Sequence, residues 1–265
     1  MTIARLAVVS VILTACSVLV MSVLVKRWKL ERENFRGDPI PTGYGFMLVI
    51  AAVPVYVWLG AQAGLFLGLV LGFGVLGLID DIYGTREAGG FRGHLRLLLK
   101  GRVSTGLVKA IGGGLLSLAA GMVAAKGAPT AGILNALVIS FSANTLNLLD
   151  LRPGRAVSCF WVGMLALGFV PPARSLAPYL LPVMIPALWL SVLDRSAKVM
   201  LGDAGSNVLG AVLGLAIVLS LGVPAKLVLV ILMAAVNIYS EKYSISRLIE
   251  NNGFLTRLDR LLGER

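Results

Sequence analysis

Nine long apolar runs occupy most of this chain, and they restrict its possible folds more than any other feature. A helix needs roughly 20 apolar residues to cross a bilayer, with a range of about 17–25. Continuous runs of this length do not fit the alternating strands of a membrane β-barrel. They predict an all-α integral membrane protein, a polytopic bundle of about nine transmembrane helices. The runs lie near residues 3–25, 43–60, 63–79, 104–125, 129–149, 157–173, 176–193, 204–222 and 224–240.

Composition agrees with a membrane protein and excludes other classes. Hydrophobic residues make up 57% of the chain and charged residues 14%, with a mean hydropathy of +0.88, whereas soluble domains are about 45–50% apolar and about 25% charged. Disorder is excluded because it needs low hydrophobicity. A disulfide scaffold is not expected, because Cys16 and Cys159 both lie inside apolar runs. The first run lacks a small-residue cleavage site and predicts a retained helix rather than a signal peptide.

The charges predict how the bundle is oriented. Of the 24 basic residues, 19 fall in the odd-numbered connections and the tail, and basic residues mark the cytoplasmic side. The N-terminus is therefore expected outside and the C-terminus inside. Residues 1–240 would form the transmembrane domain. Residues 241–265 read as a cytoplasmic amphipathic helix that lies on the membrane or packs beneath the bundle.

The net charge of +11 has two readings. No helix-turn-helix, zinc or RNA-binding signature is present, so nucleic acid is not an expected partner. The charge is instead attributed to orientation and to attraction for anionic membrane lipids. A sharper reading adds an anionic substrate. All 13 acidic residues also lie on the cytoplasmic side, which the orientation rule does not require.

Four of these acids stand at the ends of apolar runs. Asp80 and Asp81 end the third run, Asp150 ends the fifth, and Asp203 begins the eighth. The alternating topology places all four at one face of the membrane, where carboxylates are costly and usually functional. Two adjacent acids at the C-terminal end of a helix repel each other and oppose the helix dipole. A bound divalent cation would remove that penalty.

Oxygen ligands and phosphate favour Mg²⁺, with Mn²⁺ as the alternative. His94 is the one histidine in the chain, so a zinc site of histidines and cysteines is not expected. Gly202, Gly205 and Ser206 surround Asp203 and predict a free helix N-terminus that suits phosphate.

Asn144 and Asn147 are spaced three residues apart, and Asp150 follows after three more. This spacing puts the three side chains on one helical face. They form either hydrogen bonds between helices or one wall of a polar site. Together with the acids, they predict a cytoplasm-facing site for a phosphate-bearing substrate.

Four segments carry a more specific resemblance, in the order and on the side that a known family has them. The chain resembles the polyprenyl-phosphate N-acetylhexosamine-1-phosphate transferases, which include the phospho-N-acetylmuramoyl-pentapeptide translocase and enzymes that place N-acetylglucosamine-1-phosphate on undecaprenyl phosphate. The segments are IPTGYG at 40–45, LIDDIYG at 78–84, NTLNLLDLRPGRA at 144–156 and MLGDAGSNVLG at 200–210.

The resemblance implies an enzyme of the bacterial cytoplasmic membrane that acts in cell-wall or cell-surface glycan synthesis. A polyprenyl phosphate attacks a UDP-sugar, UMP leaves and a sugar-diphospholipid remains, with Mg²⁺ neutralising the diphosphate. The resemblance also implies a homodimer. It implies catalytic roles for Asp80, Asp81, Asp150 and Asp203, metal binding by Asp203 with Asp80 and Asp81, and substrate binding by Thr42, Lys109, Asn144, Asn147, Gly205 and Ser206. Lys109 could instead extend its ammonium to the membrane surface.

The chain also departs from the family pattern. Pro153 replaces the second Asp of the Asp-Gly-x-Asp-Gly segment and Leu151 its first Gly, in a stretch that helps to hold uracil in the family. The family's last cytoplasmic loop carries histidines, and 241–265 has none. These differences make the pentapeptide substrate the less favoured alternative. The same scaffold could also serve a transport or lipid-binding protein, or an inactive relative, although all four principal carboxylates are retained.

Overall fold

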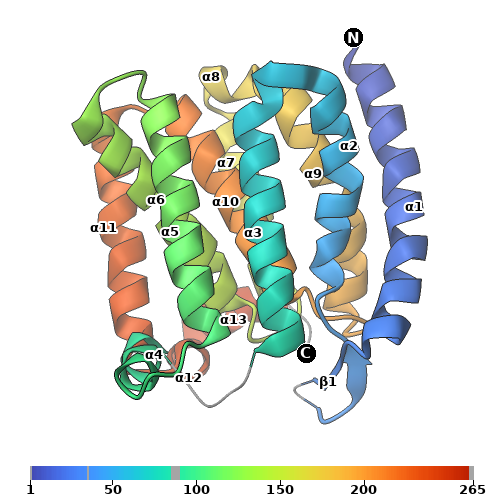
Figure 1. Cartoon of the computed structure of the whole chain (residues 1–265), viewed down its shortest axis with the longest axis vertical. Helices are drawn as coiled ribbons and strands as arrows, with labels where there is room; N and C mark the ends of the chain where they lie inside the picture. The colour runs from blue at the N-terminus through green and yellow to red at the C-terminus, as the bar shows by residue number, and fades with distance from the viewer. Residues whose placement is uncertain (1, 35, 85–89, 263–265) are drawn as a thin grey trace.

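The structure is a computed structural model of the chain, and it describes residues 2–34, 36–84 and 90–262. Long helices run side by side and form a bundle (Figure 1). The helices of the bundle are α1 (Ile3–Trp28), α2 (Met47–Leu59), α3 (Gly64–Tyr83), α5 (Thr105–Ala124), α6 (Pro129–Leu149), α7 (Arg155–Gly168), α9 (Ala177–Arg195), α10 (Gly202–Ser220) and α11 (Val223–Ser240).

The expected fold class, an all-α multi-pass membrane protein, is confirmed. Among the described residues, seven segments are long and apolar enough to cross a membrane. One of them, Tyr44–Tyr83, spans 40 residues and contains both α2 and α3, separated by the turn at Gly60–Ala63. The predicted run at 157–173 is instead α7, with 14 residues, followed by the short helix α8 (Pro171–Arg174).

The helices begin and end at local signals in the sequence. The Ser104 hydroxyl accepts a hydrogen bond from the Leu107 amide at 3.3 Å and caps α5. Pro129 stands in the first turn of α6, where its missing N–H costs nothing. Gly60 has φ +72° and ends α2, because this backbone conformation is unfavourable for residues with a Cβ. These signals fix where each helix meets its connecting loop.

Helix α10 is the centre of the bundle. It packs against α3, α6 and α7, and all its residues from Ala204 to Val218 are buried. Small residues allow this close packing. A Cβ on Gly210 would lie 2.5 Å from Ala143 Cα, and one on Gly214 would lie 2.8 Å from Ile139 Cα. The N-terminus of α10, which carries Asp203, is therefore held in a fixed position by its neighbours.

A β-hairpin at the charged end was not expected from the sequence. Strands β1 (Glu31–Glu33) and β2 (Pro39–Pro41) pair antiparallel, with Arg32 opposite Ile40. The chain after β2 then joins the segment before α10: the Met200 amide donates to Pro41 O at 2.7 Å, and the Gly45 amide donates to Leu201 O at 2.9 Å. The segments 40–45 and 200–210 are thus joined by backbone hydrogen bonds.

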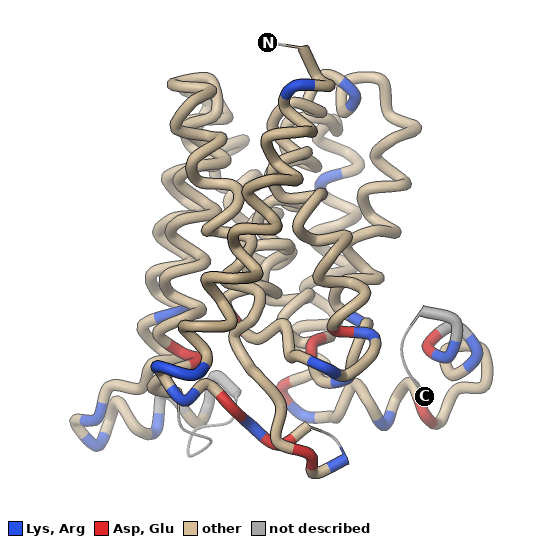
Figure 2. The backbone as a smooth tube through the Cα atoms, turned by 90° about the vertical axis from the view of Figure 1, so that its right-hand side faces the viewer, with Lys and Arg blue, Asp and Glu red and all other residues tan. Residues whose placement is uncertain are grey.

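The charged residues gather at one end of the bundle, with few at the end near the N-terminus (Figure 2). Helices α4 (Gly90–Leu99), α12 (Ile245–Glu250) and α13 (Gly253–Leu262) lie at this charged end (Figure 1). The tail is therefore two helices, interrupted near Asn251 and Asn252, where one was predicted. The side chain of His94 lies outside the described residues.

The tail packs beneath the bundle, which was one of the two predicted placements. Arg155, at the start of α7, donates from Nε to Asp259 Oδ1 at 2.5 Å and from Nη2 to Asp259 Oδ2 at 2.7 Å. Its Nη1 donates to Ser246 Oγ at 3.0 Å. One buried guanidinium therefore ties both tail helices to the beginning of α7.

Candidate active site

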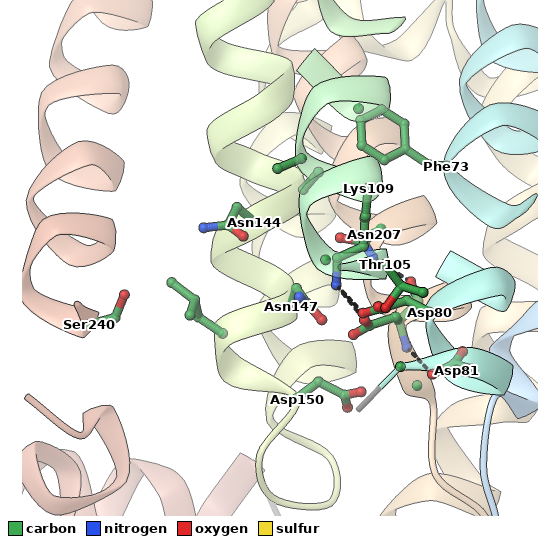
Figure 3. Close-up of a pocket in the computed structure, with 18 of the residues that line it drawn as sticks. Phe73, Asp80, Asp81, Thr105, Lys109, Asn144, Asn147, Asp150, Asn207 and Ser240 are labelled. Carbon is green, nitrogen blue, oxygen red and sulfur yellow. Dashed lines mark hydrogen bonds and ion pairs between the residues drawn. The ribbon is translucent and has the colours of Figure 1, made fainter. Parts of the chain in front are cut away.

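A cavity of about 790 Å³ lies at the charged end of the bundle, a size typical of ligand sites. All four sequence motifs contribute residues to its wall. Figure 3 shows several of them pointing towards one another from separate helices. The predicted site residues that line the cavity are Thr42, Asp80, Asp81, Lys109, Asn144, Asn147, Asp150 and Asp203.

Lys109 joins two of the predicted carboxylates. Its Nζ donates to Asp80 Oδ2 at 3.0 Å and forms a second ion pair with Asp203 Oδ2. The side chains of Lys109, Asp80 and Asp203 are 18%, 16% and 23% exposed. Because these side chains are partly buried, solvent ions screen their ion pairs less than pairs at the open surface. Lys109 therefore does not extend towards the membrane surface, the second placement considered for it.

Asp81 holds the N-terminus of α10. Its Oδ1 accepts a hydrogen bond from the Asp203 amide and its Oδ2 one from the Ala204 amide, both at 2.9 Å. The prediction of a free helix N-terminus for phosphate is therefore wrong, because a carboxylate already occupies it. The same contacts relieve the repulsion expected between Asp80 and Asp81: the helix amides compensate one charge and Lys109 the other.

Glycines allow these segments to approach so closely. Gly202 has φ +71°, and a Cβ there would lie 2.8 Å from Asp81 Oδ2. Gly205 packs on Gly45: a Cβ on Gly45 would lie 2.3 Å from Gly205 Cα. Gly205 is thus a packing residue and does not line the cavity, contrary to its predicted role in substrate binding. Neither Gly202 nor Gly205 has room for a Cβ unless the surrounding backbone shifts.

The polar face of α6 forms hydrogen bonds to other helices and also lines the cavity. The two interpretations of Asn144 and Asn147 are therefore compatible. Asn147 Oδ1 accepts a hydrogen bond from the Ser206 hydroxyl at 3.0 Å. Ser206 is buried behind Asn147 and is not part of the cavity wall. Asn144 donates to Asn237 of α11, and Asn237 in turn donates to Thr145 Oγ1 at 3.0 Å. These contacts orient the amides that face the cavity.

Asp150 lies at the end of α6 beside further acidic residues. Burial raises the pKa of the Asp150 carboxyl well above its usual range, and the negative charges of Asp194, Asp203 and Asp81 raise it further. Asp194 itself accepts a hydrogen bond from the Gly154 amide at 2.7 Å. Asp194 therefore fixes the turn after Asp150 and adds negative charge behind it.

Several residues of the site region were not found from the sequence, among them Asn207 and Thr105, which also line the cavity. Arg32 lines the cavity and its Nη2 donates to the carbonyls of Asp81 and Gly84 at 3.0 and 3.2 Å. Asn237 lines the cavity near the end of α11, and Asp194 supports the turn at Gly154. Of Arg32, Asn237 and Asp194, only Asn237 left a signal in the sequence, because an asparagine is unusual within an apolar run.

Two carboxylates of the site have the chemistry to bind Mg²⁺ together with water and substrate phosphate. Among the described residues, no group of three or more His, Cys, Asp and Glu side chains is arranged to hold a metal ion. Mg²⁺, however, is usually bound through one or two carboxylates, with water and substrate phosphate completing its shell. Asp80 and Asp203, which share Lys109 at the cavity wall, provide such a pair.

Comparison with known proteins adds no family. The chain matches no protein-family model, and a search of curated proteins finds no similar sequence. Its function has to be inferred from the residues of the cavity and from the motifs that meet there.

Proposed function

We propose that the protein is a Mg²⁺-dependent membrane transferase that moves a sugar-1-phosphate from a UDP-sugar to a polyprenyl phosphate and releases UMP. The convergence of the four motifs on one cavity carries this proposal. Residues from 42 to 207 meet there although the membrane segments separate them in the sequence. A set of carboxylates, amides and one lysine at the polar end of an apolar bundle suits transfer between a soluble donor and a membrane lipid.

The shape of the cavity supports a lipid acceptor. Its wall continues from the carboxylates to apolar residues inside the bundle, among them Phe73 and Phe141. It also reaches α11, which packs mainly on α6 and has no buried residue. A long apolar chain can therefore lie within the membrane while its phosphate reaches Lys109 and Asp203.

The chemistry assigned to the site needs positioning and charge compensation more than a strong base. An oxygen of the lipid phosphate attacks the β-phosphorus of the donor. The bond from that phosphorus to the bridging oxygen breaks, and UMP leaves with that oxygen. Asp80 and Asp203 would hold Mg²⁺, which neutralises charge on the diphosphate. Lys109 binds phosphate, Asn147 orients it, and Asp81 positions Asp203 through its amide.

The proposed topology has nine spans. Helices α2 and α3 each count as one span, and α7 crosses with α8. This arrangement puts the N-terminus outside and the cavity at the cytoplasmic face, where a nucleotide-sugar is available. The excess of basic residues at the cavity end supports this orientation.

UMP release tests the proposal. The purified protein is incubated with undecaprenyl phosphate, Mg²⁺ and a panel of UDP-sugars, with Asp203→Asn in parallel. We expect UMP from one donor, its loss in a chelator, and a decrease of roughly 10²–10³-fold in the variant, the usual effect of removing one electrostatic group. The control is Asp38→Asn, which changes an exposed acid of the hairpin.

The expected result is full activity for Asp38→Asn and almost none for Asp203→Asn. A folded wild-type protein that releases no UMP from any donor would contradict the proposed reaction. Equal loss in both variants would contradict the assignment of Asp203.

A further inference from the structure

Lys109 occupies the position that a cation at this site would need. Its ammonium forms ion pairs with both Asp80, at the end of α3, and Asp203, at the start of α10. It enters from a third helix, α5. The lysine thus compensates two carboxylates that no other basic side chain contacts among the ion pairs of the described residues.

The carboxylate of Asp81, next to Asp80 in the sequence, is already engaged by the backbone of α10. Both oxygens of Asp81 accept backbone hydrogen bonds from the first turn of α10. Turning Asp81 towards a cation would leave the amides of Asp203 and Ala204 without acceptors inside the protein, at a cost of about 1–3 kcal/mol each. Of Asp80, Asp81 and Asp203, the two that can turn to a divalent cation without breaking these backbone hydrogen bonds are therefore Asp80 and Asp203.

A divalent cation and the ammonium cannot share these oxygens as they now stand. Mg²⁺ requires its oxygen ligands at about 2.0–2.1 Å in octahedral geometry, and both charges are positive. The ammonium of Lys109 can move into the cavity of about 790 Å³, because the lysine lines that cavity and its four-carbon stem is flexible. Asn144, Asn147 and Asn207 line that cavity, so a displaced ammonium meets polar groups.

We infer that the Lys109 ammonium is an exchangeable counter-ion. It holds Asp80 and Asp203 together in the metal-free protein and moves into the cavity when a divalent cation binds there. The displaced ammonium is then available to the phosphate of a substrate. Binding of the metal and presentation of the lysine become one event. This inference rests on the proposed function, because it assumes that the site takes a divalent cation.

The first experiment measures Mn²⁺ binding by electron paramagnetic resonance in the purified wild type and in Lys109→Met. If the ammonium competes with the metal, its removal tightens Mn²⁺ binding, and we expect about a tenfold lower Kd. A purely structural lysine predicts weaker binding instead, because the carboxylates would separate. The matched control is Lys226→Met, which removes a lysine that donates to Asn135 at 2.9 Å, away from the cavity.

A second experiment needs no variant and remains informative if Lys109→Met does not fold. The wild type is acetylated with an amine-reactive ester, with and without Mg²⁺, and the peptide containing Lys109 is quantified by mass spectrometry. We expect Mg²⁺ to increase acetylation of Lys109, because the ammonium leaves its two carboxylates. Acetylation of Lys226 serves as the internal reference and stays constant.

The outcomes separate this inference from the proposed reaction. Unchanged or weaker Mn²⁺ binding by folded Lys109→Met, or protection of Lys109 by Mg²⁺, overturns the exchange while UMP release can still occur. Tighter binding in the variant without UMP release from the wild type supports the exchange and contradicts the proposed reaction. Absence of Mn²⁺ binding in every variant overturns both.

Discussion

The charge of Asp150 depends on its surroundings. Burial and the nearby carboxylates of Asp194, Asp203 and Asp81 raise its pKa. A carboxyl with a raised folded pKa contributes stability that is fully present below its unfolded pKa of about 3.9. That contribution is lost as the pH rises towards the folded pKa. The metal-free protein should therefore lose stability over this range because Asp150 resists ionisation.

Asp150→Asn should remove this loss. In a chelating buffer, we expect the variant to gain in Tm over the wild type as the pH rises from 4 towards 8. Each 1 kcal/mol corresponds to about 2–4 °C for a chain of this size. The measurement is thermal unfolding in detergent across that range. Asp38→Asn, at an exposed position, should follow the wild type. A constant difference between Asp150→Asn and the wild type would contradict the assignment.

At the residue scale, the sequence located the carboxylates but not their partners. Asp80, Asp81, Asp150 and Asp203 could be found because acids at the ends of apolar runs are conspicuous. Gly205 was misassigned, because a glycine beside a helix N-terminus looks the same whether a ligand or another backbone approaches it. In the structure, that neighbour is Gly45. Only the fold brings these two glycines together.

At the scale of elements, the apolar helices could be predicted and the small elements at the charged end could not. Length and hydrophobicity identify a membrane helix without knowledge of its neighbours. The hairpin β1–β2 has strands of only three residues, and backbone contacts with Met200 and Leu201 help to hold it. The position of α13 likewise depends on Arg155, which is distant in sequence.

The Arg155 contacts predict how the tail is held. Arg155 and Asp259 are 7% and 25% exposed. Removing one partner of a buried ion pair costs about 3–5 kcal/mol, and the partial exposure of Asp259 puts the cost towards the lower value. Arg155→Met should therefore release the tail. Trypsin should then cut at Arg257 and Arg260 faster than in the wild type, as followed by mass spectrometry.

The matched control is Arg152→Met. Arg152 contacts Glu250 of α12 at 3.4 Å, and these side chains are 40% and 54% exposed. Exposed pairs of this kind contribute about 0–1 kcal/mol. Trypsin should therefore cut the tail of this variant at the wild-type rate. Equal rates for Arg155→Met and Arg152→Met would show that the buried pair does not hold the tail.

At the scale of the whole molecule, the apolar segments predicted the bundle, while the central place of α10 could not be predicted. Hydropathy does not distinguish α10 from α11, yet α10 is almost wholly buried and α11 has no buried residue. Both are apolar enough to lie in lipid. The difference lies in glycines such as Gly210 and Gly214, whose importance becomes visible only when α6 lies against them.

The nine-span topology predicts which loops face the cytoplasm. In a background in which Cys16 and Cys159 are replaced by serine, single cysteines are introduced at Ala61 and Asp38. Both positions are exposed and lie at opposite ends of α2. We expect a membrane-impermeant maleimide to label Ala61→Cys in intact cells and Asp38→Cys only after permeabilisation. Labelling of both from outside would contradict two separate spans for α2 and α3.

The burial of α10 also has a consequence for biosynthesis. A ribosome makes the chain from its N-terminus, so α3, α5, α6 and α7 are made before the helix on which they pack. Until α10 has been made, the earlier helices lack the helix on which they pack, and their mutual packing in the membrane is incomplete. The final packing of the bundle therefore depends on a helix that is made late, and the end that carries the cavity is assembled only after most of the chain has been translated.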